Sequence, residues 1–284
     1  MTPGSGPGFG GGMSIHLRQA LRQQLGDLRY ETTGTWVRAT LGDVAVADTT
    51  SALLVWEPRR VVPSYAVPLA DLHAELVPVS AVGADGRAIL HPGVPFAAHS
   101  APGEAFSLRV AGRELPQAAF RPADPDLAGH VVLDFSAFDV WYEEDVPLVG
   151  DPRDPYHRVD IRRSSRHLRL ELDGRLLAET RRPTLVVETN LPIRYYLPRQ
   201  DVTVQLRPSP LRTTCAYKGV ASYWSIDGQE NLVWAYEHPL EEARELAGLM
   251  AFYDERVQIT VERGGDAVVD ADIRAALAEE AASR

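Results

Sequence analysis

The sequence predicts a mainly β protein of the α+β class, built from two tandem compact β domains with a short helix at each end. Three observations support this prediction. Short apolar runs alternate with Gly, Asp and Pro along most of the chain, which is typical of strands joined by tight turns. Several of these runs recur in the same order in the second half of the chain. The 284 residues suffice for two domains, each with its own core.

The two ends of the chain differ from its middle. Residues 1–12 are rich in Gly, Pro and Ser, so we expect them to be disordered, and Met13 is an alternative start. Residues 13–30 predict an amphipathic helix with Ser14 as its N-cap and with apolar residues at near-helical spacing, namely Ile15, Leu17, Leu21 and Leu25. Residues 266–284 predict a second short helix that ends in a frayed tail.

The middle of the chain divides into two predicted β domains. The first covers residues 31–146, the second covers residues 160–265, and a proline-rich linker over residues 147–159 joins them. Segments such as HLRLELDGRLLAET predict hairpins, because a glycine in the turn adopts positive φ without a steric penalty. One segment is different: PLEEARELAGLMAFY, residues 239–253, has apolar residues spaced as in a short helix.

An internal repeat aligns the two domains. One register places LGDVAVADT over LDGRLLAET and Glu57 over Glu188. Further along, AAHSAPGEAFSL in the first copy faces TTCAYKGVASYW in the second, with Gly103 over Gly219. The glycine is kept, whereas the polar residues around Cys215 are replaced in the first copy. We therefore expect the second copy to carry a functional site and the first copy to be degenerate.

Composition excludes several classes of function. The net charge of −10 argues against a protein that coats nucleic acid, which needs a basic surface. One cysteine excludes an internal disulfide and a multi-cysteine zinc site, and it fits a reducing cytoplasm. No other metal-ligand spacing occurs, and we expect neither a metal nor a cofactor. Without an apolar run of membrane-spanning length or a secretion signal, the sequence predicts a soluble cytoplasmic protein with no membrane partner.

Several segments resemble a known family. ADTTSALLVWEP and PSYAVP in the first domain, and RYYLP, TTCAYKGVASYW, WAYEHP and LAGLMAFY in the second, resemble the bacterial family catalogued as domain of unknown function 427 (DUF427). The resemblance covers most of residues 35–145 and 160–265, so the chain looks like a tandem version. Its most specific piece is TTCAYKG, where the family usually has proline in place of Ala216.

The resemblance implies a fold more than a function. It implies compact β domains of the tent-like, Mss4-like kind, some of which hold structural zinc between cysteine pairs that this chain lacks. The family is also labelled a nucleotidyltransferase-type domain, and no motif in this sequence supports that chemistry. The resemblance therefore leaves the ligand or substrate open.

The segment TTCAYKGVASYW offers two candidate catalytic groups, Cys215 and Lys218. A thiol beside a cation can become a nucleophile if its pKa is lowered, and His238 is a histidine of the same copy that could serve as its base. The alternative is a small buried apolar side chain beside a lysine that lies on a turn. Nothing in the spacing places a histidine next to the thiol.

The same region offers a set of ligand-binding candidates. Lys218 and Gly219 could present an amine and an open backbone N–H to an anion. The planar guanidinium of Arg194 could donate further hydrogen bonds to the same anion. The remaining candidates are a carboxylate in an apolar run and nearby aromatic or imidazole side chains: Glu188, Tyr195, Tyr217, Trp234 and His238. Aromatic residues that alternate along paired strands more often form core than a binding surface.

Three functions remain open from the sequence. The first is a protein that binds a small anionic molecule in a pocket of the second copy. The second is an enzyme, for example a transferase, that uses Cys215 or Lys218. The third is an interaction module in which the first copy is a scaffold, which an exposed apolar patch on that copy would favour. The sequence identifies neither a ligand nor a protein partner.

Overall fold

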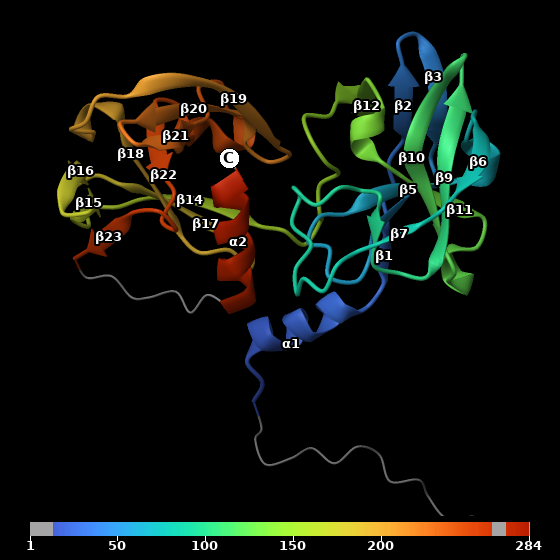
Figure 1. Ribbon diagram of the computed structural model, residues 1–284, viewed down its shortest axis with the longest axis horizontal. Helices are drawn as coiled ribbons and strands as arrows, with labels where there is room; N and C mark the ends of the chain where they lie inside the picture. The colour runs from blue at the N-terminus through green and yellow to red at the C-terminus, as the bar shows by residue number, and fades with distance from the viewer. Residues whose placement is uncertain (1–13, 263–270, 284) are drawn as a thin grey trace, which may run out of the picture.

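The computed structural model describes residues 14–262 and 271–283, so the predictions for residues 1–12 and Met13 lie outside it. Two β lobes lie side by side (Figure 1). We call residues 29–147 the first half and residues 159–262 the second half. Helix α2 (Ala271–Ser283) stands between the lobes, and α1 (Leu17–Gln23) precedes the first half. The mainly β prediction with a short helix near each end is confirmed.

The first half contains two antiparallel sheets. The larger has seven strands, in the spatial order β1 (Arg29–Thr32), β4 (Leu53–Trp56), β5 (Ser64–Pro68), β11 (His130–Leu133), β10 (Arg113–Pro122), β9 (Gly103–Val110) and β6 (Glu75–Val79). The smaller has the order β13 (Val146–Pro147), β12 (Val140–Glu143), β2 (Val37–Leu41) and β3 (Val44–Thr49). A separate parallel pair joins β7 (Val82–Gly83) and β8 (Ala98–His99).

The second half follows the same strand order. Its larger sheet has the order β14 (Val159–Arg163), β17 (Thr184–Glu188), β18 (Arg194–Pro198), β22 (Leu249–Phe252), β21 (Gln229–Ala235), β20 (Gly219–Ile226) and β19 (Arg207–Cys215). Its smaller sheet has the order β16 (Arg175–Thr180), β15 (Leu168–Leu172) and β23 (Gln258–Val261). Each strand of the larger sheet therefore has a counterpart at the same place in the first half.

Local sequence explains the hairpins. Between β15 and β16, Asp173 and Gly174 both have positive φ, 50° and 77°, as a two-residue type I′ turn requires. Leu168 and Leu170 are fully buried on β15, whereas Arg169 between them is partly exposed, so one face of the strand packs on the core. The predicted LDGR hairpin therefore forms with its expected turn.

Each half has its own hydrophobic core. The first is centred on Trp141, whose ring stacks on Tyr65 with centroids 5.2 Å apart. The second includes Tyr196 and Phe252, and Ala281 of α2 packs into it. A smaller apolar cluster joins Ile89 of the first half to Ile273 of α2. Helix α2 thus belongs to the second core while it also contacts the first half.

The N-terminal helix is shorter than predicted. Helix α1 begins after His16 rather than Ser14, makes no side-chain cap hydrogen bond, and continues as a 3-10 turn, η1 (Gln24–Gly26). Residues 29 and 30, predicted as helix, instead begin strand β1, because they pair with β4. The other short 3-10 segments are η2 (Leu69–Asp71), η3 (Pro125–Leu127), η4 (Phe135–Ala137) and η5 (Arg199–Asp201).

The helix predicted within residues 239–253 is wrong. Only Glu241–Leu246 is helical, as the 3-10 segment η6, and Leu249–Phe252 forms strand β22. Gly248 has φ of +76°, which ends the helical turn, and the next residues pair with β18 and β21 in the sheet. Ala243, Leu246 and Met250 are buried here, as they would be in a helix, so their spacing did not distinguish a helix from a turn followed by a strand.

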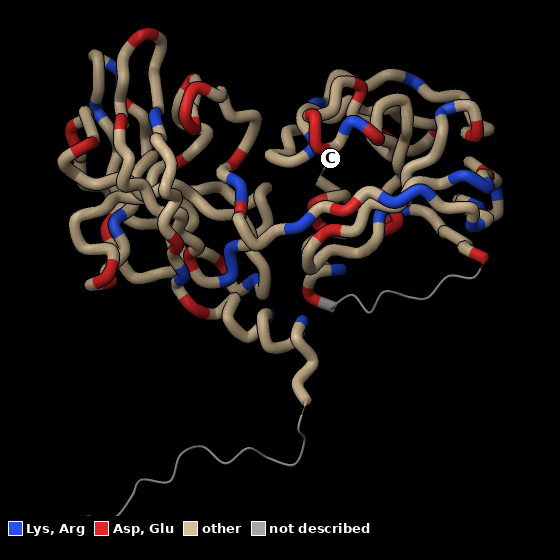
Figure 2. The backbone as a smooth tube through the Cα atoms, turned by 180° about the vertical axis from the view of Figure 1, so that it is seen from behind, with Lys and Arg blue, Asp and Glu red and all other residues tan. Residues whose placement is uncertain are grey.

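Acidic and basic residues are interspersed over both lobes (Figure 2). Within the described residues, no helix is long and apolar enough to cross a membrane. The arginines at 162 and 163 lie on β14, which is an edge strand of its sheet, and they face the carboxylates of Asp160 and Glu245. The positive charges of these two arginines are thus partly neutralised by nearby carboxylates.

A substitution at Gly103, at the start of β9, would test the packing of the first half. A Cβ at this position would lie 2.4 Å from the carbonyl oxygen of Arg121 and 2.5 Å from the Phe120 ring. Gly103→Ala should lower the free energy of unfolding by about 1–3 kcal/mol, because the backbone must move. Gly86→Ala is the matched control, since no atom lies within 4 Å of its Cβ position. Urea titrations that give equal stabilities for both variants would contradict this packing.

Candidate functional site

The turn between β19 and β20 places Lys218 in the protein interior. Cys215 pairs with Gly219 across this turn, and the Lys218 N–H donates to the Cys215 carbonyl at 3.3 Å. Gly219 has φ of +99°, which is strained for any residue with a Cβ. The turn buries the Lys218 side chain, which is 8% exposed. Lys218 is the only lysine in the chain, and its position is set by a turn that requires glycine.

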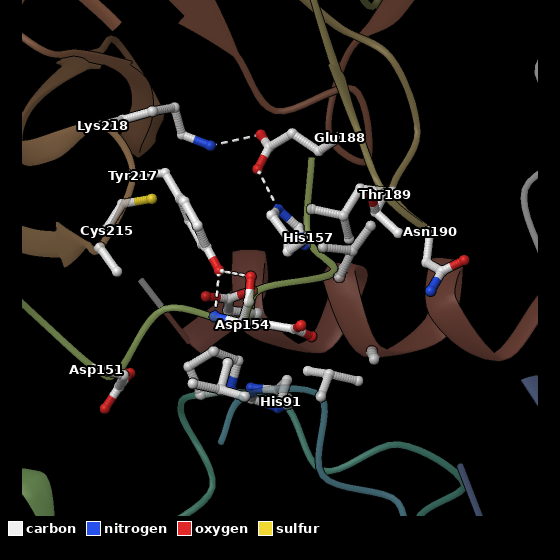
Figure 3. Close-up of a pocket in the computed structure, with 18 of the residues that line it drawn as sticks. His91, Asp151, Asp154, His157, Glu188, Thr189, Asn190, Cys215, Tyr217 and Lys218 are labelled. Atoms are coloured by element: carbon white, nitrogen blue, oxygen red, sulfur yellow. Dashed lines mark hydrogen bonds and ion pairs between the residues drawn. The ribbon is translucent and has the colours of Figure 1, made fainter. Parts of the chain in front are cut away.

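A buried row of charged groups meets the Lys218 ammonium (Figure 3). Its Nζ donates to Oε1 of Glu188 at 2.5 Å, and the other oxygen of Glu188 lies 3.4 Å from Nε2 of His157. Glu188 ends β17 and is 9% exposed. Both carboxylate oxygens of Glu188 therefore face a basic side chain.

Burial and pairing act in opposite directions on these groups. Burial alone would raise the pKa of Glu188, but the Lys218 charge and the His157 hydrogen bond outweigh it and lower the pKa to about 2. Burial alone would lower the pKa of Lys218, whereas the Glu188 carboxylate raises it above its ordinary value. The pair is therefore fully ionised at neutral pH.

The linker between the halves forms part of the site. Arg153 donates from Nε to the Ala216 carbonyl at 2.9 Å, and the Asp154 N–H donates to the Tyr217 hydroxyl at 2.7 Å. The His157 ring stacks on Tyr217, with centroids 4.7 Å apart. Burial is the main reason that the pKa of Tyr217 is raised, to about 12. The linker thus holds the turn and supplies the histidine that contacts Glu188.

A cavity of about 370 Å³ lies between the halves, next to this row of charges. The second half contributes aromatic side chains to its wall, namely Tyr196, Tyr217, Tyr223, Trp234, Tyr236 and Tyr253. The first half contributes Val61, Val62, Pro63, Ile89, His91 and Pro92. Helix α2 adds Ile273, Ala276, Leu277 and Glu280. The cavity is thus enclosed by three parts of the chain that are far apart in sequence.

Arg194 also lines the cavity, but its charge is already paired. Its Nη1 lies 2.7 Å from Oδ1 of Asp254, and its Nη2 lies 2.6 Å from Oε1 of Glu255. Burial alone would lower the pKa of Arg194, and the two carboxylates instead raise it. Its guanidinium also lies over the Trp234 ring, 5.9 Å from the centroid. Two carboxylates therefore compensate one guanidinium.

The structure brings six of the nine predicted site residues to this cavity: Glu188, Arg194, Cys215, Tyr217, Lys218 and Trp234. Tyr195, Gly219 and His238 are not among its lining residues. Side chains alternate along β18, so Tyr196 lines the cavity in place of Tyr195. His238 is exposed beyond the end of β21. Gly219 shapes the turn without lining the cavity.

Cys215 lies close enough to Lys218 for the two to interact electrostatically, but no histidine hydrogen-bonds to it in the described part of the chain. Its sulfur points toward the cavity, and the Tyr217 ring stands between it and His157 (Figure 3). No hydrogen bond from a histidine reaches it among residues 14–262 and 271–283. The same residues contain no group of three or more His, Cys, Asp or Glu side chains that could hold a metal ion.

The equivalent place in the first half is filled by protein. Glu57 is buried and accepts from the backbone N–H groups of Ser100 and Ala101, and its Oε1 lies 3.0 Å from Nδ1 of His99. Arg60 donates to the carbonyls of Pro95, Phe96 and Ala98, at 2.8, 3.1 and 2.7 Å. A buried glutamate next to a base thus occurs in both halves, and the loop after β7 closes over the first one.

Comparison with known proteins gives a family match for one part of the chain. Residues 160–263 match the family described as "Domain of unknown function (DUF427)". The resemblance of this segment to DUF427 is therefore confirmed, and the matched residues coincide with the second half. No curated protein matches the chain.

Acid should weaken the fold through the Glu188–Lys218 pair. The folded protein keeps Glu188 ionised down to a pKa of about 2, whereas the unfolded chain takes up a proton near the ordinary value of 4.5. This contribution to stability is fully present above 4.5 and is lost as the pH falls from 4.5 to about 2. Urea titrations at a series of pH values measure the free energy of unfolding.

The matched control is the double variant Glu188→Leu with Lys218→Met, which replaces the ion pair by apolar side chains of similar size. Because it has no carboxylate at this position, its free energy of unfolding should change less with pH than that of the wild type. Equal pH dependence in the two proteins would contradict the pairing.

Proposed function

We propose that the protein binds a small, mostly apolar and uncharged molecule in the cavity between its two halves. One observation carries this proposal: the cavity of about 370 Å³ is lined mainly by aromatic and aliphatic side chains, with a few buried polar groups among them. Ligand pockets usually have volumes of roughly 300–1,000 Å³ and this kind of lining. Planar aromatic molecules fit such walls best, because they can stack on tyrosine and tryptophan rings.

The pairing of the cavity's cations changes the ligand class expected from the sequence. Lys218 and Arg194 are the residues on which an anionic ligand was predicted. Both face carboxylates at 2.5–2.7 Å, so neither has an uncompensated charge to offer. Asp151 and Asp154 also line the cavity. An anion would have to displace one of these ion pairs, which favours an uncharged ligand.

The pKa shifts favour binding over catalysis. Lys218 with a raised pKa is a poor base and nucleophile at neutral pH, and Glu188 with a pKa of about 2 is a poor acid. Tyr217, with a pKa of about 12, stays protonated and can only donate or accept a hydrogen bond. Among the described residues no histidine hydrogen-bonds to Cys215, so the enzyme hypothesis lacks a general base for this thiol.

We further infer that the two halves are copies of one fold that have diverged in use. The shared order of the seven strands and the matching positions of Glu57 and Glu188 support this inference. In the first copy, Arg60 and the loop after β7 fill the space beside the glutamate, and the outer surface of the same loop region forms a wall of the cavity. The first copy thus acts as a scaffold for the second.

Two dyes that differ by one charged group test the proposal. N-phenyl-1-naphthylamine is uncharged, and 8-anilinonaphthalene-1-sulfonate is nearly the same molecule with a sulfonate. The uncharged dye should bind with one-to-one stoichiometry and at least about tenfold more tightly, because the sulfonate would meet Asp151 and Asp154. Fluorescence titration and isothermal titration calorimetry measure the two affinities.

Variants of α2 locate the binding. Ala276→Trp fills the cavity and should abolish binding of the uncharged dye, whereas Ala278→Trp, on the exposed side of the same helix, should leave it unchanged. Thermal unfolding of both variants checks that they are folded. Absence of binding in the wild type, or equal binding by both variants, would refute the proposed site.

A further inference from the structure

His91 is a buried polar residue that makes no contact with the Glu188–Lys218 ion pair. It lies in the first half, in the loop between β7 and β8, and lines the cavity. Only 8% of the residue is exposed. Figure 3 places it across the cavity from Lys218 and Glu188. The imidazole therefore lies at the opposite end of the cavity from the Glu188–Lys218 ion pair.

The local backbone fixes which nitrogen carries the proton. The Gly93 N–H donates to Nδ1 of His91 at 3.1 Å, so Nδ1 is an acceptor. In the neutral imidazole the proton then lies on Nε2. A Cβ on Gly93 would lie 2.9 Å from Cε1 of His91, so glycine permits this close approach. The loop thus presents Nε2–H as a hydrogen-bond donor of fixed orientation.

Nε2 of His91 is buried and has no hydrogen-bond partner among the described residues. A buried donor without a partner costs about 1–3 kcal/mol. The polar groups at the far end of the cavity are satisfied, Lys218 and Glu188 by each other and Tyr217 by Asp154, whereas Nε of the lining residue Arg29 is a second buried nitrogen without a partner among the described residues. Unlike Arg29, whose Nη2 already donates to the Arg60 carbonyl, the His91 side chain has its one N–H donor without a partner among the described residues.

We propose that the ligand carries an uncharged oxygen acceptor, such as a ketone or amide carbonyl, that accepts the Nε2–H of His91. This inference rests on the proposed function and narrows its ligand class. A carboxylate is disfavoured as the acceptor, because Asp151 and Asp154 line the same cavity. The first half then supplies a specificity-determining contact, and the second half supplies the aromatic walls.

A second pair of uncharged dyes tests the contact. Prodan, 6-propionyl-2-(dimethylamino)naphthalene, carries a ketone, whereas N-phenyl-1-naphthylamine has no carbonyl group. His91→Phe removes the donor and keeps a planar ring. It should weaken prodan binding about tenfold and leave the affinity for the other dye unchanged. His238→Phe, outside the cavity, should change neither affinity.

Nitrogen NMR of the wild type gives a readout that does not depend on the variant's folding. With ¹⁵N-labelled histidine, the Nε2 resonance of His91 should shift when prodan binds and should move less with the dye that lacks a carbonyl. If both dyes bind and neither the variant nor the resonance discriminates between them, the inference is wrong while the proposed function stands. Loss of both dyes in a folded His91→Phe variant would also overturn it, because it would indicate a packing role. If neither dye binds the wild type, both proposals fail.

Discussion

The ion pair between Glu188 and Lys218 is the interaction on which the rest of the site depends. Two ions removed from water are stable only if they meet in good geometry and their remaining hydrogen-bonding positions are satisfied. The chain meets this requirement with the glycine turn that directs Lys218 inward, the end of β17 that carries Glu188, and His157 from the linker. Removing one partner of such a pair typically costs about 3–5 kcal/mol. The pair therefore ties the turn, the sheet and the linker into one unit.

This arrangement explains why the cavity lies between the halves. The linker must lie against the turn for His157 to reach Glu188, and this brings the first half to face the aromatic side of the second. Helix α2 packs into the second core through Ala281 and meets Ile89 of the first half through Ile273. The volume left among these three parts is lined mainly by apolar side chains, and the charges of Glu188, Lys218 and Arg194 at its edge are paired. The chamber suits an uncharged aromatic molecule for the same reason.

Much of the fold could be predicted from the sequence, because alternation and turn residues are local. The LDGR hairpin and the two terminal helices follow from such patterns. The segment after Leu240 could not be assigned, since buried residues in a 3-10 turn and a short strand imitate helical spacing. Glu188, Cys215 and Lys218, to which the internal alignment pointed, all line the cavity. Tyr196 lines the cavity and the predicted Tyr195 does not, because neighbouring residues on a strand point to opposite faces.

The remaining site residues could not be found from sequence spacing. His157 lies 31 residues from Glu188 and His91 lies in the other half, so only the packing of the two halves brings them to the cavity. The sequence also contained no sign of the pairing of Arg194 with Asp254 and Glu255, which is a reason that we propose an uncharged ligand in place of the anionic one. Electrostatic compensation depends on contacts across the fold, which local patterns do not encode.

Intermolecular nuclear Overhauser effects between bound N-phenyl-1-naphthylamine and assigned side chains test the central claim most directly. A molecule held between the halves should give contacts to Val62 of the first half, Tyr217 of the second half and Leu277 of α2 in one complex. Contacts confined to one half, or contacts to Leu17 and Leu21 in the groove beside α1, would contradict the account.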